Sequence, residues 1–381
     1  MQKYDVGSRS PGTYEKWVEE EGVPVHEALI GVEDVAELRR EAWPRMGGRG
    51  AIIQMLSLYQ AEKGMYVIEI PPGGALNPER HIYDEFLFVV SGRGATEVWV
   101  EEGPRRSFEW GQGSAFAMPL NAWHRLMNGS SEPALIMGLT TAPRIMNTVH
   151  DTDFVFNCDY RFAKGYAGEN DYFSRAKKYP RGGRSNSMIW ETNFIANAYQ
   201  FKLDPPHSDP RSQKVAGGLR GSFHMSTNWP NGHFSQWPVG IYHKAHRHGP
   251  GAVIIGLNGT GYVLAWPPHL TSHPYENGFG DKVARMSWGN RSVYTPPDNW
   301  YHQHLNTGKE VARHIAVHPG VDRSQLLDFE GFQDVPVLVS EREGGAMIAY
   351  EDEDPEIRRQ FEEELARAGI KSDMPRLSSK S

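Results

Sequence analysis

The sequence predicts an all-β protein made of two repeated domains, with short helices near both ends. Three observations support this fold class. Apolar runs of β-like composition, separated by Gly, Pro and Asn, fill one region from 51 to 143 and another from 191 to 335. The two regions repeat the same residue types at the same spacing. The 381 residues are enough for two cores of ordinary size.

We expect five consecutive parts along the chain. They are an N-terminal helical arm, a first β domain, a connecting segment of irregular structure, a second β domain, and a C-terminal helix with its tail, over residues 1–45, 46–145, 146–190, 191–335 and 336–381.

The two ends of the chain show helical periodicity. Thr13–Glu21 and Val32–Trp43 carry apolar residues at helix-like spacing among charges, which predicts two helices in the arm. Near the C-terminus, Ile357, Phe361 and Leu365 recur at spacing four, as on a surface helix with one buried face.

Composition restricts the classes of function. Cys158 is the only cysteine, so a metal site within one chain needs His and carboxylate ligands rather than thiolates. The net charge is -7 and the sequence has no Lys/Arg clusters, so it predicts no basic patch that would bind nucleic acid. No apolar run reaches the roughly 18 to 20 residues that span a bilayer, and the N-terminus lacks the apolar core of a secretion signal. We therefore expect a cytoplasmic protein that binds a small molecule and contacts neither nucleic acid nor membrane.

Two motifs recur with equal spacing in the two β regions. In the first region Gly73 is followed by Glu79, His81, Glu85 and Gly92. In the second, the matching residues are Gly240, His246, His248, Ala252 and Gly259. A second block then reads Pro-x-Asn-x-x-His-x-x-x-Asn in both regions, ending at Asn128 and Asn306, with His124 and His302 as its histidines. Agreement of two blocks in order and spacing indicates an internal duplication.

These blocks resemble the two motifs of the cupin superfamily, Gly-x5-His-x-His-x3-Glu-x6-Gly and Pro-x-Gly-x2-His-x3-Asn. The resemblance covers residues 50 to 140 and 195 to 330. It implies two cupin domains, each a double-stranded β-helix or jelly roll with room for a ligand inside. It also implies association into a homo-oligomer through sheet edges and the N-terminal arm.

The second region carries the residues expected to bind metal. Alternate residues of a strand share a face, so His246 and His248 point to the same side, and His302 comes from a later strand. Three neutral imidazoles leave coordination positions open on a divalent ion. The alternative is that the two strand histidines lie on a solvated face. Ala252 stands where cupins often carry a glutamate ligand, and HRHGPGAVIIGLNGTG and NWYHQHLN resemble segments of gentisate-type dioxygenases. The resemblance implies Fe(II), with Mn(II) or Ni(II) as alternatives.

Two further residues are candidates for catalysis. His304 follows His302 by two positions and is expected to face the same side, either as a base or hydrogen-bond donor, or as an ordinary core histidine. Arg313 is a candidate anchor for a substrate carboxylate, because a guanidinium binds carboxylates through two hydrogen bonds.

The first region carries a possible second metal site. His81, Glu85 and His124 occupy ligand positions of the family, while Glu79 replaces the first histidine. Two carboxylates and two imidazoles suit manganese or iron. The alternative is a barrel that has lost its metal, with Glu79 paired to an arginine.

The leading functional hypothesis is an iron(II) dioxygenase of the gentisate type, acting on a small aromatic or conjugated acid. A second hypothesis is a hydrolase, isomerase or lyase that uses manganese, nickel or iron without dioxygen. A third is a protein that binds metal or ligand without catalysis.

Overall fold

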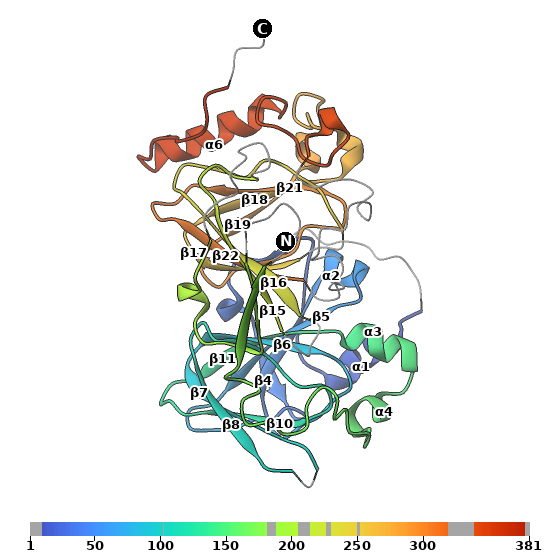
Figure 1. Ribbon diagram of the computed structural model, residues 1–381. Coiled ribbons are helices and arrows are strands. Elements are labelled where there is room, and N and C mark those ends of the chain that lie inside the picture. Colours follow the sequence, from blue (N-terminus) through green and yellow to red (C-terminus); the bar gives the residue numbers. More distant parts are fainter. Residues whose placement is uncertain are drawn as a thin grey trace.

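Two β sandwiches, each a large sheet facing a small one, make up the protein. The computed structural model describes residues 10–101, 103–180, 188–204, 214–225, 230–249, 252–318 and 339–377. Each sandwich pairs an eight-stranded sheet with a three-stranded sheet. Figure 1 shows the second sandwich, in yellow to red, above the first, in blue to green. The expected fold class of two jelly-roll domains with few short helices is confirmed.

The first domain holds its apolar runs in strands. Its large sheet has the order β1-β4-β5-β11-β6-β9-β14, with β3 beside β4, and its small sheet has the order β10-β7-β8. The bounds are β1 Val25–Ala28, β3 Glu41–Trp43, β4 Gly48–Met55, β5 Gly64–Ile70, β6 Glu85–Ser91, β7 Arg93–Trp99, β8 Arg106–Gly111, β9 Ala115–Ala117, β10 Trp123–Asn128, β11 Ala134–Thr140 and β14 Phe194–Ile195.

The second domain repeats this plan. Its large sheet has the order β12-β13-β15-β16-β22-β17-β20-β2, and its small sheet has the order β19-β18-β21. The bounds are β2 Gly31–Val32, β12 Ala176–Pro180, β13 Met188–Thr192, β15 Leu219–His224, β16 Asn231–Trp237, β17 Val253–Asn258, β18 Gly261–Trp266, β19 Ala284–Trp288, β20 Val293–Tyr294, β21 Tyr301–Asn306 and β22 Ala312–His318.

Helices are short and lie outside the sandwiches. The α-helices are α1 Thr13–Glu21, α2 Leu56–Gln60, α3 Ala142–Val149, α4 Thr152–Asn157 and α6 Pro355–Arg367, and the 3-10 turns are η1 Val35–Glu37, η2 Ala198–Gln200, η4 Pro268–Leu270, η5 Gly280–Lys282 and η6 Glu341–Glu343. Helix α6 buries Ile357, Phe361 and Leu365, as their spacing predicts. None of the helices in the described ranges has the length and apolar character that crossing a membrane requires.

The two domains share strands and a core. Strand β2 comes from the N-terminal arm but pairs with β20 of the second domain, and β14 pairs with β9 of the first. One apolar cluster contains Val67 and Phe88 from the first domain and Phe223 and Ile315 from the second. The large sheets therefore bury their outer faces against each other.

Two sequence expectations about secondary structure are wrong. The stretch Val32–Trp43 forms the end of β2, the turn η1 and the strand β3 rather than a helix, because pairing with the sheets outweighs its weak helical periodicity. The segment 146–190 is not irregular throughout, because it holds the end of α3, all of α4 and the strand β12. The expected boundary at residue 335 lies outside the described residues.

Candidate metal centres

The duplicated motif produces the same backbone frame in both domains. The isolated bridges Ala75 to Met127 and Glu79 to His124 in the first domain match Tyr242 to Leu305 and His246 to His302 in the second. In each domain the segment that carries the first two motif residues thus lies beside the strand that carries the last histidine.

Left-handed backbone explains two positions of the motif. Gly73 and Gly240 have φ angles of 62° and 72°, and Asn121 and Asn299 have 55° and 61°. Asparagine adopts this conformation more readily than most residues with a side chain. It can therefore replace the glycine of the second cupin block and keep the turn before His124 and His302.

In the second domain the structure brings His246, His248 and His302 together. One ligand atom from each lies within 4.8 Å of the others. The ring centroids are 4.4 Å apart for His246 and His302, 4.9 Å for His248 and His302, and 5.6 Å for His246 and His248. This spacing suits three ligands of one ion.

Backbone carbonyls orient two of these imidazoles. His246 Nδ1 lies 2.9 Å from the carbonyl oxygen of Lys244, and His302 Nδ1 lies 3.0 Å from that of Trp300. Because a carbonyl oxygen only accepts, both Nδ1 atoms carry the proton. Each Nε2 atom therefore keeps its lone pair for a metal.

The environment keeps the three imidazoles neutral. Burial lowers the pKa of His302, the Trp300 carbonyl opposes this shift and the charge of Lys214 adds to it, which gives a pKa of about 4. Burial, then the charges of Lys214 and of the neighbouring imidazoles, lower the pKa values of His246 and His248 well below the usual range. The neutral form, which binds metals, therefore prevails at pH 7.

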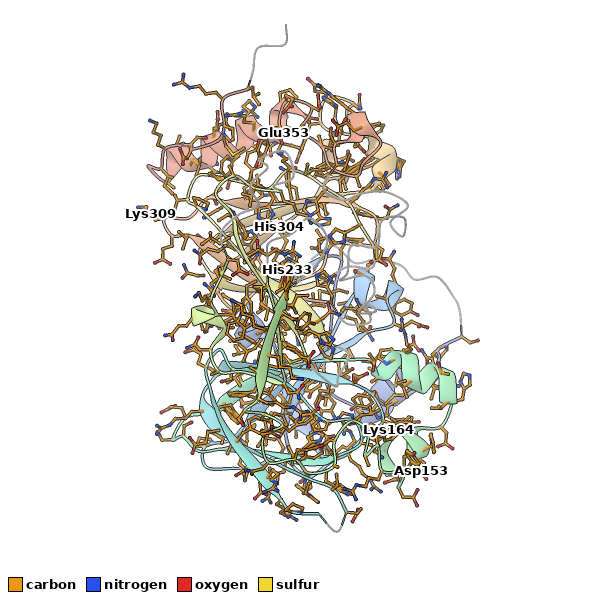
Figure 2. The ribbon with its side chains drawn as sticks, in the orientation of Figure 1. Asp153, Lys164, His233, His304, Lys309 and Glu353 are labelled. Carbon is orange, nitrogen blue, oxygen red and sulfur yellow. The ribbon has the colours of Figure 1, made fainter. Side chains whose placement is uncertain are left out.

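Further imidazoles line the interior beside this centre, where Figure 2 labels His304. The ring of His304 lies 5.7 Å from that of His302. The Tyr294 hydroxyl lies 2.9 Å from His304 Nδ1 and 3.0 Å from His314 Nδ1. Both ring nitrogens of buried His243 have no hydrogen-bond partner among the described residues. Sequence reasoning missed His243, His314 and Tyr294, although His314 shares the alternating pattern of an inward-facing strand.

Arg313 does not join these imidazoles. Its guanidinium donates to the carbonyl oxygens of Ala198 and Phe201 and to the Gln236 side chain at 3.1 Å. Its neighbour His314 contacts His304, so strand alternation points Arg313 to the other face. The structure therefore does not bring Arg313 to these imidazoles, and its role as a substrate anchor stays a prediction.

In the first domain His81, Glu85 and His124 form a similar cluster. Glu85 Oε2 lies 3.5 Å from His81 Nε2 and 3.7 Å from His124 Nε2. The His81 and His124 Nδ1 atoms face the carbonyl oxygens of Tyr83 at 2.9 Å and Ala122 at 3.1 Å. Glu85 Oε2 and both Nε2 atoms are buried without a hydrogen bond in the described structure. Three orphaned ligand atoms facing one point suit a divalent ion.

A phenol holds the carboxylate of this cluster. The Tyr66 hydroxyl donates to Glu85 Oε1 at 2.7 Å. Burial raises the pKa of Glu85, but the nearby imidazole of His81, together with His124 and the Tyr66 hydroxyl, lowers it to about 2. For His81 the effects are reversed. Burial lowers the pKa of this imidazole, but the neighbouring carboxylates of Glu85 and Glu79 raise it above its usual value. Glu85 is therefore an anionic ligand at neutral pH.

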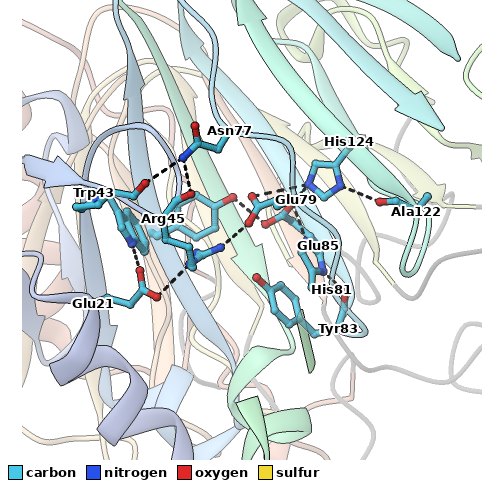
Figure 3. Close-up of polar contacts among 12 residues, drawn as sticks. Glu21, Trp43, Arg45, Asn77, Glu79, His81, Tyr83, Glu85, Ala122 and His124 are labelled. Atoms are coloured by element: carbon cyan, nitrogen blue, oxygen red, sulfur yellow. Dashed lines mark hydrogen bonds and ion pairs between the residues drawn. The ribbon is translucent and has the colours of Figure 1, made fainter. Parts of the chain in front are cut away.

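The fourth expected ligand, Glu79, lies at the edge of the cluster. Its Oε1 atom is 3.8 Å from His124 Nε2, and its Oε2 atom accepts from Arg45 at 2.5 Å (Figure 3). The group whose ligand atoms lie within 4.8 Å of one another contains His81, Glu85 and His124 without Glu79.

A comparison with protein families supports the fold of the first domain. Residues 66–140 match the family model of the Cupin domain, which spans β5 to β11. No curated protein matches the sequence significantly. A deletion mutant of Bacillus subtilis oxalate decarboxylase is similar in structure, with 10% identity, 77% of each chain covered and a TM-score of 0.46. A structure of that enzyme concerned with its Mn(II) centres has the same values. A third, concerned with proton-coupled electron transfer, has 12% identity, covers 77% of this chain and 78% of its own, and has a TM-score of 0.46.

Proposed function

We propose that the protein is an iron(II)-dependent dioxygenase that acts on a small aromatic or conjugated acid at the centre of the second domain. The observation that carries this proposal is a set of three neutral imidazoles, buried His246 and His302 with half-buried His248, which no carboxylate of the described residues joins. Such a set binds a divalent ion through three positions and leaves the others for substrate and dioxygen. An iron(II) ion held there supplies the one-electron chemistry with dioxygen that amino-acid side chains lack.

Charge at this centre favours an acid as the substrate. The charge of Lys214 lowers the pKa values of His243, His246, His248, His302 and His304, so the lysine acts on the whole cluster. With neutral ligands and a divalent ion, the centre is positive overall. A positive site attracts anions such as carboxylates.

His304 is the residue that we assign to proton handling or substrate orientation. It is buried, its ring is 5.7 Å from that of His302, and burial lowers its pKa well below the usual range. Tyr294 fixes its ring through Nδ1. A neutral imidazole in this place can accept a proton or donate a hydrogen bond to a substrate oxygen.

Oxygen uptake tests the proposal. The protein is loaded with Fe(II) and supplied with a series of hydroxylated benzoates. We expect uptake with at least one of them, loss of uptake in His302→Ala, and unchanged uptake in His26→Ala, which removes a histidine from strand β1 of the first domain. Uniform absence of uptake contradicts the proposed substrate class. Full turnover under strict anaerobiosis would instead support a hydrolase, isomerase or lyase that uses manganese, nickel or iron.

A further inference from the structure

Arg45 is a partly buried cation beside the centre of the first domain. Its Nε atom donates to Glu21 Oε1 at 3.0 Å, and its terminal nitrogen donates to Glu79 Oε2 at 2.5 Å. Burial lowers the pKa of Arg45, but the charges of Glu79, Tyr83 and Glu21 outweigh burial and raise it. Figure 3 shows the chain of contacts from Glu21 through Arg45 to Glu79 and His124.

The carboxylate of Glu79 faces two partners, Arg45 and His124. Glu79 occupies the motif position of His246, and its backbone pairs with His124 as that of His246 pairs with His302. Its Oε2 atom belongs to the ion pair with Arg45, while Oε1 stays 3.8 Å from His124 Nε2. Arg45 therefore holds the side chain at the margin of the cluster.

Aromatic rings and helix α1 enclose the cation. The Arg45 Cζ atom lies 4.8 Å from the ring centroid of Phe156, 5.4 Å from that of Trp17 and 5.6 Å from that of Trp43. The cavity that Arg45 lines with Tyr66, Tyr83 and Glu85 measures about 10 Å³. A space of this size holds about one water molecule, so no organic substrate fits between Arg45 and Glu85.

The formal charges around the first centre explain why Arg45 lies beside it. Glu21, Glu79 and Glu85 contribute three negative charges, and Arg45 contributes one positive charge. A divalent ion on His81, Glu85 and His124 makes this set neutral when both imidazoles are neutral. Without Arg45 the set keeps one negative charge, and Glu79 is free to turn toward the ion.

We propose that Arg45 withholds Glu79 from the metal, so that the first domain holds a divalent ion through His81, Glu85 and His124 and without Glu79. In this role Arg45 is a positioning residue that sets the number of protein ligands. The proposal concerns the first domain and does not depend on dioxygenase activity in the second.

Titration with Mn(II) tests the role of Arg45. All proteins carry His302→Ala so that the second centre does not contribute, and electron paramagnetic resonance measures free Mn(II). We expect Arg45→Met, which keeps the packing on Trp17 and Trp43 but removes the charge, to bind Mn(II) about tenfold or more tightly, because second carboxylate ligands strengthen such sites. Adding Glu79→Gln to Arg45→Met should remove the gain. Equal or weaker binding in Arg45→Met, or no binding in the parent, overturns the proposal.

A second variant keeps the test decisive if Arg45→Met does not fold. Glu79→Gln alone, in the same His302→Ala parent, should leave the Mn(II) affinity within about twofold, because Glu79 is not a ligand when Arg45 is present. A tenfold loss in Glu79→Gln would show that Glu79 binds the ion despite Arg45 and would refute the proposal.

Discussion

The two centres share a backbone frame but differ in charge. In the second domain the imidazoles of His246, His248 and His302 form a cluster that no carboxylate in the described ranges joins, and the charge of Lys214 acts on them. In the first, Glu85 lies between His81 and His124, with Glu79 and Arg45 beside them. The comparison teaches that a few substitutions on one duplicated scaffold give centres of opposite electrostatic character.

The covers of the two sandwiches differ in the same way. The charged pairs of Arg45 with Glu21 and Glu79 lie between helix α1 and the first centre. In the second domain the C-terminal segment pairs with the segment that contains His246, since Ile348 donates its backbone N–H to the Ala245 carbonyl oxygen at 2.8 Å and Met347 forms an isolated bridge with His246. There a buried Glu353 accepts from the Tyr242 hydroxyl. The second cover thus carries a buried hydrogen bond between Tyr242 and Glu353, in addition to ion pairs such as Arg285 with Glu364.

Removing the carboxylate of the first centre should have the largest effect. Glu85→Ala takes away the only anionic ligand of that cluster, and we expect at least a hundredfold loss of Mn(II) affinity there, with the second centre unaffected. Metal analysis after gel filtration measures both. Retention of the full metal content in Glu85→Ala combined with His302→Ala would contradict the assignment of Glu85.

Adding a carboxylate to the second centre should make it resemble the first. Ala252 is buried at the motif position of Glu85. We expect Ala252→Glu to reduce Fe(II)-dependent oxygen uptake about tenfold or more while the metal is retained, since the added charge occupies an open position and repels an acid substrate. Ala252→Gln has nearly the same volume without the charge. Equal loss in both variants would indicate crowding rather than charge.

Removing the phenol that holds Glu85 should have a moderate effect. Tyr66→Phe deletes the donor to Glu85 Oε1, and loss of such an orienting bond weakens metal sites about 10- to 100-fold. Tyr83→Phe is the matched control, because it keeps the ring stacked 3.7 Å from His81. Mn(II) titration in the His302→Ala parent compares them. A similar affinity in both variants argues against a role for the Tyr66 hydroxyl.

The buried carboxyl of Glu353 in the second domain should affect stability rather than metal content. Burial raises the pKa of Glu353 to about 8, although its bond with Tyr242 opposes this. The folded state then keeps a proton that the unfolded state releases above pH 4.5, so stability falls as pH rises from 4.5 to 8 and levels off above.

Urea unfolding between pH 4 and 9 checks this sign. Between pH 4.5 and 8, ionisation of Glu353 should lower the free energy of unfolding of the wild type by up to about 1.4 kcal/mol per pH unit. Glu353→Gln should remove this contribution to the slope of the free energy of unfolding against pH. Identical slopes in the two proteins would show that Glu353 ionises in the folded state as it does in the unfolded chain.

Much of the fold and of both ligand sets could be predicted from the sequence. The motif spacing is informative because a turn at Gly73 or Gly240 and a left-handed Asn121 or Asn299 determine where the following residues lie. Alternation along a strand then places His302 and His304 on one side. These are local constraints, and one chain with an internal repeat displays them twice.

The remaining features depend on contacts between distant parts of the chain. Strand β2 of the N-terminal arm pairs with β20, some 260 residues away. No local sequence pattern predicts that the arm joins the sheet of the second domain. Arg45 reaches Glu79 from another loop, and Tyr294 joins His304 to His314 across two strands. Alternation separates Arg313 from His314, but only the fold shows which of the two faces inward.

Anomalous X-ray diffraction from crystals grown with Fe(II) tests the central assignment most directly. Data collected on both sides of the iron absorption edge should give a peak bounded by the imidazoles of His246, His248 and His302, and no such peak in His302→Ala crystals. A wild-type map that has no anomalous density among these three rings, while iron is present elsewhere in the crystal, would contradict it.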